Sequence, residues 1–367
     1  MINWYRLKAR QLKRFPMRLL LRDLVSWEPL RDAEPGYTVV IACMGALAPL
    51  AVANMRLAMR QVKTRMHELI LVFDCPVADI PEIVHEGCAE FSGSTRIQLL
   101  GYSDWQHFAA RKLNWGWVYS WLSWSLAIAR SRTRALVIHD LDALPIHERL
   151  FESLYDNWLE EGAEFCGISR YRGNGVTEQM NLARTPELVV DAHYLRERFR
   201  PIDLFNKLSL VDGRVVDFDT LLYVQTMAGR CAMRAIDEAN LIHPSQVICN
   251  YTDFVSGRAS FEGATHSLLV LAYLLYLGGD STMLSVVSAQ LTDGNAMTIR
   301  LFDKDLYIDG IPPDHWAWNE KLIRRAEQAL FGRCRPEVLR FLAGFISRAG
   351  NYRTVGREHG ASGVDDR

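Results

Sequence analysis

The feature that most constrains the fold is an alternation of short apolar runs with helical segments, which begins after residue 35. Each run has the length and the aliphatic composition of a buried strand, and helical spacing of apolar residues follows it. The runs are YTVVIA (37–42), ELILVFD (68–74), RIQLLGY (96–102), ALVIHDLD (135–142) and AEFCGISRYRG (163–173). Apolar strands joined by helices predict a mostly parallel central sheet that is flanked by helices on both faces.

Polar residues that follow these strands are candidates for ligand binding, because ligands of parallel sheets bind beyond the carboxyl ends of the strands. Residues 43–45 follow the first run, Asp74 ends the second, and Tyr102 ends the third. Asp140 and Asp142 end the fourth run. We expect these residues to lie near one edge of the sheet.

The pair Asp140 and Asp142 has the chemistry of a metal site. Carboxylates at the end of a strand can turn toward a common point and bind Mg²⁺ or Mn²⁺ together with the phosphate oxygens of a substrate. The metal would then neutralise a leaving diphosphate. The alternative is that the two acids cap the turn and the helix that follow, because residues 142–150 resemble a helix start with a proline.

Composition restricts the compartment and the partners. Seven cysteines lie at wide spacings without a C-x-x-C pair, which favours a reducing compartment over a disulfide framework. The longest apolar run (268–277) is much shorter than the roughly 20 residues that span a bilayer, and no signal-peptide pattern is visible. The net charge of −1 implies no nucleic-acid partner. We therefore expect a cytoplasmic protein.

The N-terminal segment (1–34) differs from the remainder of the chain. Residues 1–22 contain seven Lys or Arg and no acid, and they mix with Leu, Trp and Phe at helical spacing that is interrupted at Pro16. This pattern is typical of a helix on an anionic membrane surface, so we predict that residues 1–30 make peripheral contact with the inner face of a membrane. The alternative is an amphipathic helix that packs on the protein itself.

The later part of the chain is less regular. We expect the catalytic domain over 35–300, the end of a hairpin and C-terminal helices over 301–349, and a polar, disordered tail over 350–367. The pattern of residues 185–199 predicts a helix. The pattern of residues 212–229 predicts a turn, a short strand and a helix that starts near residues 217–219. The alternation in residues 297–311 predicts the hairpin.

Three segments of the chain resemble enzymes of the glycosyltransferase-A fold. KLNWGWVYSWLSWSLAIARSRTRALVIHDLDALP (112–145) looks like the part of that fold where a helix start with Asn and Gly precedes the strand that carries a metal-binding D-x-D. Residues 37–74 are similar to the first β-α-β unit, which holds the nucleotide. Residues 215–229 resemble the later acidic pair that carries the catalytic base in inverting members. The resemblance spans about residues 36–235 and includes family 2-like bacterial polysaccharide glycosyltransferases.

The resemblance implies a donor site and a metal site. A divalent metal, Mn²⁺ or Mg²⁺, and the donor diphosphate would bind at Asp140 and Asp142. Many such enzymes use a later histidine as a third ligand, for which His243 is preferred and His266 is the alternative. The other residues implied in donor binding are Cys43, Gly45, Asp74 (facing the nucleotide base), Lys112 and Asn114.

The catalytic base implied by the resemblance is Asp217, with Asp219 as the alternative. The usual pair of the family is an adjacent Glu-Asp, whereas this chain has Asp-Phe-Asp, so either carboxylate fits the role. An inverting reaction is favoured, and the reaction would be retaining if neither acid faced the acceptor. Trp117, Trp121 and Trp124 recur at helical spacing, which favours core packing over sugar stacking.

Together these features predict a glycosyltransferase-A type α/β fold with C-terminal helical additions. The expected activity is a metal-dependent, hexosyltransferase-like transfer from a nucleotide-diphospho-sugar to a hydroxyl of a glycan or lipid-linked acceptor in cell-surface polysaccharide synthesis. One alternative is a nucleotidyltransferase, but residues 42–50 have no basic residue of the kind that such enzymes carry after the first strand. Another is a non-catalytic, membrane-associated binding protein on a degenerate fold, which the intact D-x-D disfavours.

Overall fold

A computed structural model of the chain describes residues 2–359, apart from residues 94, 245, 259–266, 293–295 and 310. The chain forms two compact units. The first comprises residues 1–51, 55–141 and 147–240, and the second comprises residues 52–54, 142–146 and 241–367.

The first unit is built on a seven-stranded sheet. In spatial order its strands are β10 (Cys231–Met233), β6 (Phe165–Gly167), β7 (Leu188–Asp191), β4 (Thr133–His139), β1 (Glu34–Cys43), β2 (Met66–Phe73) and β3 (Arg96–Gly101). Parallel pairing joins β1 to β2 and β4, β2 to β3, and β6 to β10, whereas β7 is antiparallel to both β4 and β6. The predicted α/β fold with a mostly parallel central sheet is therefore confirmed.

Helices cover both faces of this sheet. Val40 and Leu136 pack with Trp121 in one buried cluster on the face that carries α5 and α7. On the opposite face, Tyr37 contacts Tyr155 of α6. The helices of this unit are α1 (Ile2–Leu21), α2 (Ala48–Arg60), α3 (Glu82–Ala89), α4 (Asp104–Leu113), α5 (Gly116–Arg130), α6 (Leu150–Glu161), α7 (Ala192–Arg198) and α8 (Leu222–Gln225).

Strand β7 was not predicted, because residues 185–199 were expected to form one helix. The structure divides this segment into β7 and α7. All four residues of β7 are buried, and the strand fills the position between β4 and β6. A short apolar run has no periodicity that separates a buried strand from a buried helix, so long-range pairing decided the outcome.

The strand register places the expected ligand-binding residues along one edge. Cys43 lies opposite Phe73 in the β1–β2 pair, and Ile41 lies opposite His139 in the β1–β4 pair. The residues that follow these strands therefore leave the sheet at the same edge. The carbonyl oxygen of Cys43 also accepts a hydrogen bond of 3.1 Å from the amide of Asp74.

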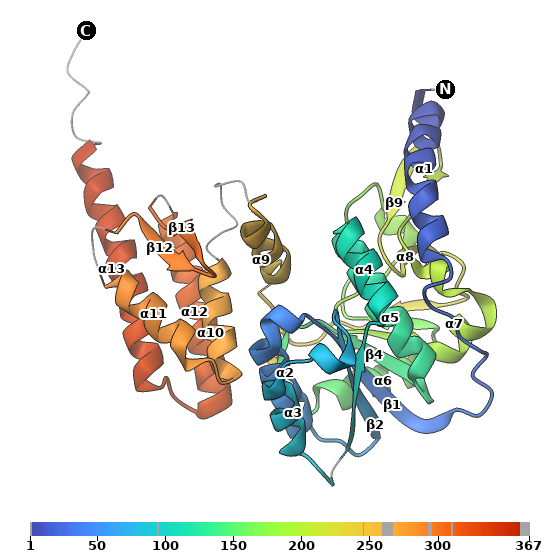
Figure 1. The fold of residues 1–367 in the computed structure, drawn as a ribbon, viewed down its shortest axis with the longest axis horizontal. Helices are drawn as coiled ribbons and strands as arrows, with labels where there is room; N and C mark the ends of the chain where they lie inside the picture. Colours follow the sequence, from blue (N-terminus) through green and yellow to red (C-terminus); the bar gives the residue numbers. More distant parts are fainter. Residues whose placement is uncertain are drawn as a thin grey trace. The chain divides into compact units, whose positions relative to one another are not determined.

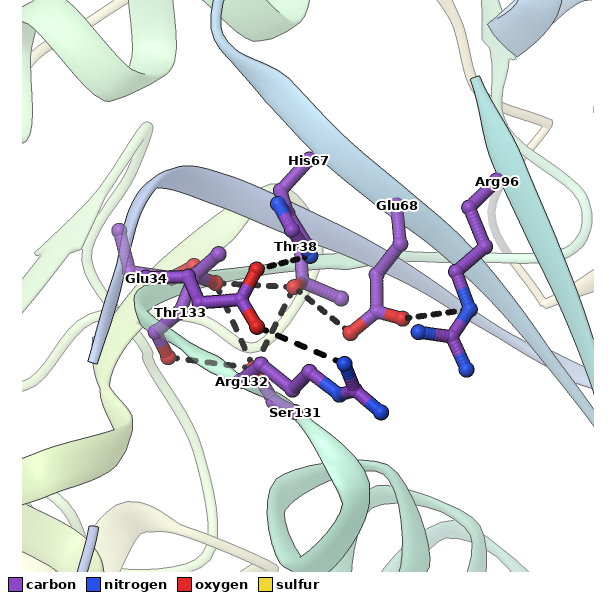
Figure 2. A network of polar contacts seen from close by, with 9 residues as sticks. Glu34, Thr38, His67, Glu68, Arg96, Ser131, Arg132 and Thr133 are labelled. Atoms are coloured by element: carbon purple, nitrogen blue, oxygen red, sulfur yellow. Dashed lines mark hydrogen bonds and ion pairs between the residues drawn. The ribbon is translucent and has the colours of Figure 1, made fainter. Parts of the chain in front are cut away.

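The opposite edge of the sheet is closed by polar contacts among β1, β2 and β4 (Figure 2). The hydroxyl oxygens of Thr38 and Thr133 lie 2.8 Å apart, and Thr133 also donates to the carbonyl oxygen of Ala135. Thr38 reaches the buried carboxylate of Glu68, which pairs with Arg96 of β3. This network fixes the amino ends of the strands. It lies at the other end of the strands from the carboxyl edge, where the candidate ligand-binding residues are found.

Removal of one hydroxyl from this network is expected to lower stability without an effect on ligand binding. Thr133→Val keeps the side-chain shape but leaves buried partners of the hydroxyl unsatisfied, which costs about 1–3 kcal/mol of unfolding free energy. Urea unfolding measures the loss, and Thr64→Val, at an exposed position, is the matched control. An equal stability of the two variants would contradict a stabilising role for the network.

The N-terminal helix α1 lies along a separate hairpin of β8 (Lys207–Val211) and β9 (Arg214–Phe218), as Figure 1 shows. The expected interruption at Pro16 does not occur, and the helix continues to Leu21. Proline supplies no amide hydrogen to the helix. Side-chain hydrogen bonds on both sides of it, from Gln11 to Leu208 and from Arg18 to Asn206, hold α1 against the hairpin region.

The second unit contains two small antiparallel pairs and several helices. The pair β12–β13 is the hairpin predicted within residues 297–311. Helix α13 passes the expected start of the polar tail at residue 350, and residues 360–367 lie outside the described part of the chain. The elements are β5 (Leu144–Pro145), β11 (Leu241–Ile242), α9 (Val247–Ser256), α10 (Ser267–Leu277), α11 (Ser281–Leu291), β12 (Thr298–Leu301), β13 (Lys304–Tyr307), α12 (Pro313–Phe331) and α13 (Pro336–His359).

Among the described residues, no helix combines the length and the apolar character needed to cross a bilayer.

Candidate active site

The predicted Asp-x-Asp site is present, and His243 joins it. The antiparallel pair β5–β11 places Leu144 opposite Ile242, so the chain just before β5 runs beside the chain just after β11. His243 Nε2 consequently lies 3.4 Å from Asp142 Oδ1. One ligand atom from each of Asp140, Asp142 and His243 lies within 4.8 Å of the others. His266, the alternative ligand, lies outside the described residues.

The donor set of this cluster fits a hard or borderline divalent cation. Two carboxylates and one imidazole supply oxygen and nitrogen, which suit Mg²⁺ and Mn²⁺. The alternative role of the two acids as helix caps does not hold. Helix α6 begins at Leu150 with Arg149 as its N-cap residue, and strand β5 lies between the acids and that helix.

A buried histidine–glutamate pair lies at the end of β4, immediately before the candidate metal cluster. The β4–β7 pairing sets Ile138 opposite Leu188, which brings His139 beside Glu187. The His139 Nδ1 atom lies 2.6 Å from Glu187 Oε1, and both side chains are fully buried. The ring of Phe151 packs edge-on against the imidazole with centroids 5.2 Å apart. A hydrogen-bonded imidazole of this kind holds its ring orientation, and so the pair defines the course of the backbone into Asp140.

Two of the predicted donor-binding residues meet directly. The amide of Gly45 donates a hydrogen bond of 2.8 Å to Asp74 Oδ1. Burial raises the pKa of the Asp74 carboxyl. His107 of α4 lies with Nδ1 2.7 Å from the carbonyl oxygen of Asp74. A Cβ at Gly45 would lie 3.4 Å from the sulfur of Cys75, which is ordinary van der Waals contact, so space alone does not require glycine at this position.

The other expected donor residues have different surroundings. Cys43 is 2% exposed and its thiol points to the carbonyl oxygen of Ile41, so its side chain faces the interior. Lys112 is exposed, with its ammonium 5.6 Å from the Phe108 ring centroid. Asn114 ends α4 in a left-handed conformation with φ 43°. Tyr102 is buried and its hydroxyl lies 2.8 Å from that of Ser123.

Asp217, the first candidate base, lies in β9 and not at a helix start. Its two carboxylate oxygens accept a bidentate pair of hydrogen bonds from Arg14, at 2.8 and 2.7 Å. Asn206 donates a further hydrogen bond of 2.8 Å to Oδ1. These partners occupy both oxygens of the carboxylate, so an acceptor hydroxyl would have to compete with Arg14 and Asn206 for them.

Asp219, the alternative base, has a different environment. Burial raises the pKa of its carboxyl to about 6, against the lowering effects of a hydrogen bond from the Thr220 amide and another from the Trp117 side chain. Leu221 follows with φ 68°, a conformation that is unusual for a branched residue and often marks functional sites. Asp219 thus has a pKa raised to about 6 and lies two residues before a left-handed backbone position.

Trp117 therefore has a polar role that helical spacing alone did not predict. Trp121 and Trp124 are buried in the core as expected, but Trp117 is only partly buried and hydrogen-bonds Asp219. The guanidinium of Arg14 lies 5.5 Å from the Trp117 ring centroid. Helix α1 and helix α5 consequently both contact the acidic pair.

No family model matches the chain, and no curated protein sequence matches it either. Solved structures similar to it include the galactosyltransferase LgtC and a mannosyltransferase. S. aureus TarS (1–349) is 13% identical over 90% of this chain and 93% of its own, with a TM-score of 0.38. The mannosyltransferase PcManGT from Pyrobaculum calidifontis, in complex with GDP-Man and Mn²⁺, is 14% identical over 94% of both chains, with a TM-score of 0.36. A mutant of LgtC is 12% identical over 61% of this chain and 79% of its own, with a TM-score of 0.38. At these identities and scores, the function proposed next rests on the residues of the chain itself.

Proposed function

We propose that this protein is a metal-dependent glycosyltransferase that uses a nucleotide-diphospho-sugar. The observation that carries the proposal is the cluster of Asp140, Asp142 and His243 after the end of a strand in a mostly parallel sheet. This is the edge at which such sheets bind nucleotides. Gly45 and Asp74 follow β1 and β2, the next two strands of the sheet beyond β4, and would contact the nucleotide there.

The residues that would hold the divalent metal, Mn²⁺ or Mg²⁺, are Asp140, Asp142 and His243. When bound, the metal supplies positive charge that stabilises the developing charge of a leaving diphosphate. The hydrogen-bonded pair of His139 and Glu187 keeps the backbone before Asp140 in place, so that little reorganisation is needed when the donor binds.

We assign acceptor activation to Asp219 in preference to Asp217, because Arg14 and Asn206 occupy the oxygens of Asp217. The acceptor hydroxyl oxygen forms a bond to the anomeric carbon of the donor sugar. The bond from that carbon to the diphosphate oxygen breaks, and the hydroxyl proton passes to the Asp219 carboxylate. This single displacement inverts the anomeric centre. The acceptor would be a glycan or lipid-linked sugar in cell-surface polysaccharide synthesis.

An assay across nucleotide-sugars tests this proposal. With Mn²⁺ or Mg²⁺ we expect at least one nucleotide-diphospho-sugar to be hydrolysed slowly without acceptor, with release of the nucleoside diphosphate, and EDTA should stop the reaction. A parallel assay with sugar phosphates and nucleoside triphosphates follows pyrophosphate release. Pyrophosphate release without donor hydrolysis would favour a nucleotidyltransferase, and neither binding nor turnover of any nucleotide would contradict the enzyme assignment.

A further inference from the structure

The two faces of α1 have opposite character. Its inner face holds the buried Leu7 and Leu21, and Arg14 and Arg18 bind side chains and carbonyl groups of the protein body. Its outer face exposes a row of large apolar side chains at helical spacing: Leu12 is 73% exposed, Phe15 57% and Leu19 50%. Burial of such a row in an apolar phase is favourable, and nothing in the described part of the chain covers it.

The charge around this row indicates the kind of surface that it meets. Residues 1–22 contain seven cations and no acid. Among the cations whose side chains the structure describes, Arg14 and Arg18 face inward. The side chains of Lys8 and Arg10 are exposed near the N-terminal part of the row. A helix with an apolar face and flanking cations is suited to the interface of an anionic bilayer, because its apolar side chains enter the acyl boundary while its cations meet the anionic headgroups.

A second feature lies at the C-terminal end of the same helix. A pocket of about 370 Å³ is lined by Arg22, Trp27, Arg196 and Arg200, with Asp23 as its acid. The guanidinium of Arg196 is held by the carbonyl oxygens of Glu28 and Ser131. Arg22 and Arg200 are largely exposed, with 53% and 72% of their side-chain surface accessible, and they pair with Asp23 and Asp203 at 3.2 and 3.8 Å. Exposed ion pairs of this kind are weak, so these two guanidinium groups, beside the indole of Trp27, are able to bind a phosphate group at a lipid surface.

We propose that the outer face of α1 and this arginine pocket form one docking surface for an anionic phospholipid bilayer. Leu12, Phe15 and Leu19 enter the boundary of the acyl chains, while Arg22 and Arg200 meet lipid phosphates. The inner face of α1 binds Asp217 through Arg14, two residues before Asp219. If the protein is the proposed glycosyltransferase, docking would hold the acceptor-activating segment next to the membrane, where a lipid-linked acceptor is found.

Vesicle sedimentation of the full chain tests the docking surface. We expect the protein to sediment with vesicles of phosphatidylcholine and phosphatidylglycerol, and to be released by high salt. Leu12→Glu/Phe15→Glu/Leu19→Glu should reduce the bound fraction at least tenfold. Arg22→Glu/Arg200→Glu should reduce binding to the anionic vesicles and leave any binding to pure phosphatidylcholine unchanged. The matched control is Leu159→Glu/Leu339→Glu/Ile346→Glu, which alters similarly exposed apolar side chains on α6 and α13.

The outcomes separate this inference from the proposed function. Donor hydrolysis in solution without vesicles should be equal in the wild type, the α1 variant and the control, and circular dichroism should show all three folded. Equal vesicle binding by the α1 variant and the control would overturn the docking surface. A wild-type dimer by light scattering that the α1 substitutions alone convert to monomer, with no vesicle binding, would assign the row to a second copy instead. If donor hydrolysis is absent while vesicle binding is intact, only the proposed enzymatic function is contradicted.

Discussion

Asp142→Ala is expected to abolish saturable Mn²⁺ binding and to lower sugar transfer by at least about a thousandfold. A divalent cation contributes several kcal/mol to the stabilisation of a leaving diphosphate, and each 1.36 kcal/mol is a factor of ten in rate. Asp142 is 5% exposed and lies 3.4 Å from His243 in the cluster. Its loss would leave one carboxylate and one imidazole, too few charges to hold the cation against water.

Electron paramagnetic resonance of free Mn²⁺ measures the binding independently of activity. Asp79→Ala, which removes an exposed carboxylate soon after β2, should bind Mn²⁺ like the wild type. His243→Ala should weaken binding less than Asp142→Ala does, because it removes a neutral ligand. Unchanged Mn²⁺ affinity in a folded Asp142→Ala protein would refute the metal assignment, and unchanged affinity in His243→Ala would remove that histidine from the ligand set.

The central sheet and its ligand edge were predictable because their signals are local. Each buried parallel strand is a continuous apolar run, and the run of residues 68–74 ends on Asp74, a candidate donor-binding residue. Because the strands are parallel, Asp74 and Asp140 must leave the sheet at its carboxyl edge, and this could be predicted without knowing any distant contact. The metal cluster followed from the same reasoning, although the choice of His243 came from the resemblance and not from a local pattern.

The residues that tune the site were not predictable, because their partners are far away in sequence. Glu187 reaches His139 only because β7 enters the sheet antiparallel to β4, and its run has no feature that separates strand from helix. Arg14 reaches Asp217 across 203 positions of the chain. Asp217 and Asp219 lie two positions apart, and no local pattern separates their roles. The distant Arg14 occupies the oxygens of Asp217, whereas burial raises the pKa of Asp219.

Asp219→Asn is expected to retain metal and donor binding and to lower transfer by about 10²–10⁴-fold, the usual contribution of a general base. The amide keeps the shape of the side chain but accepts no proton. Because burial raises the pKa of Asp219 from 3.8 to about 6, ionisation of this carboxyl lowers the free energy of unfolding between these two pH values, and the full loss is present above pH 6. The variant should therefore be no less stable than the wild type by thermal unfolding, so a loss of transfer would not reflect misfolding.

The pH profile separates a base from a residue that only shapes the site. In the wild type, kcat/KM should fall about tenfold per pH unit below pH 6, as the Asp219 carboxylate, with its pKa of about 6, becomes protonated. The residual activity of Asp219→Asn should lack this acidic limb. Asp217→Asn is the matched control: it removes the partner of Arg14 and should retain the acidic limb even if its activity is lower. If Asp217→Asn loses the limb and Asp219→Asn keeps it, the base is Asp217, and the pairing with Arg14 must open during the reaction.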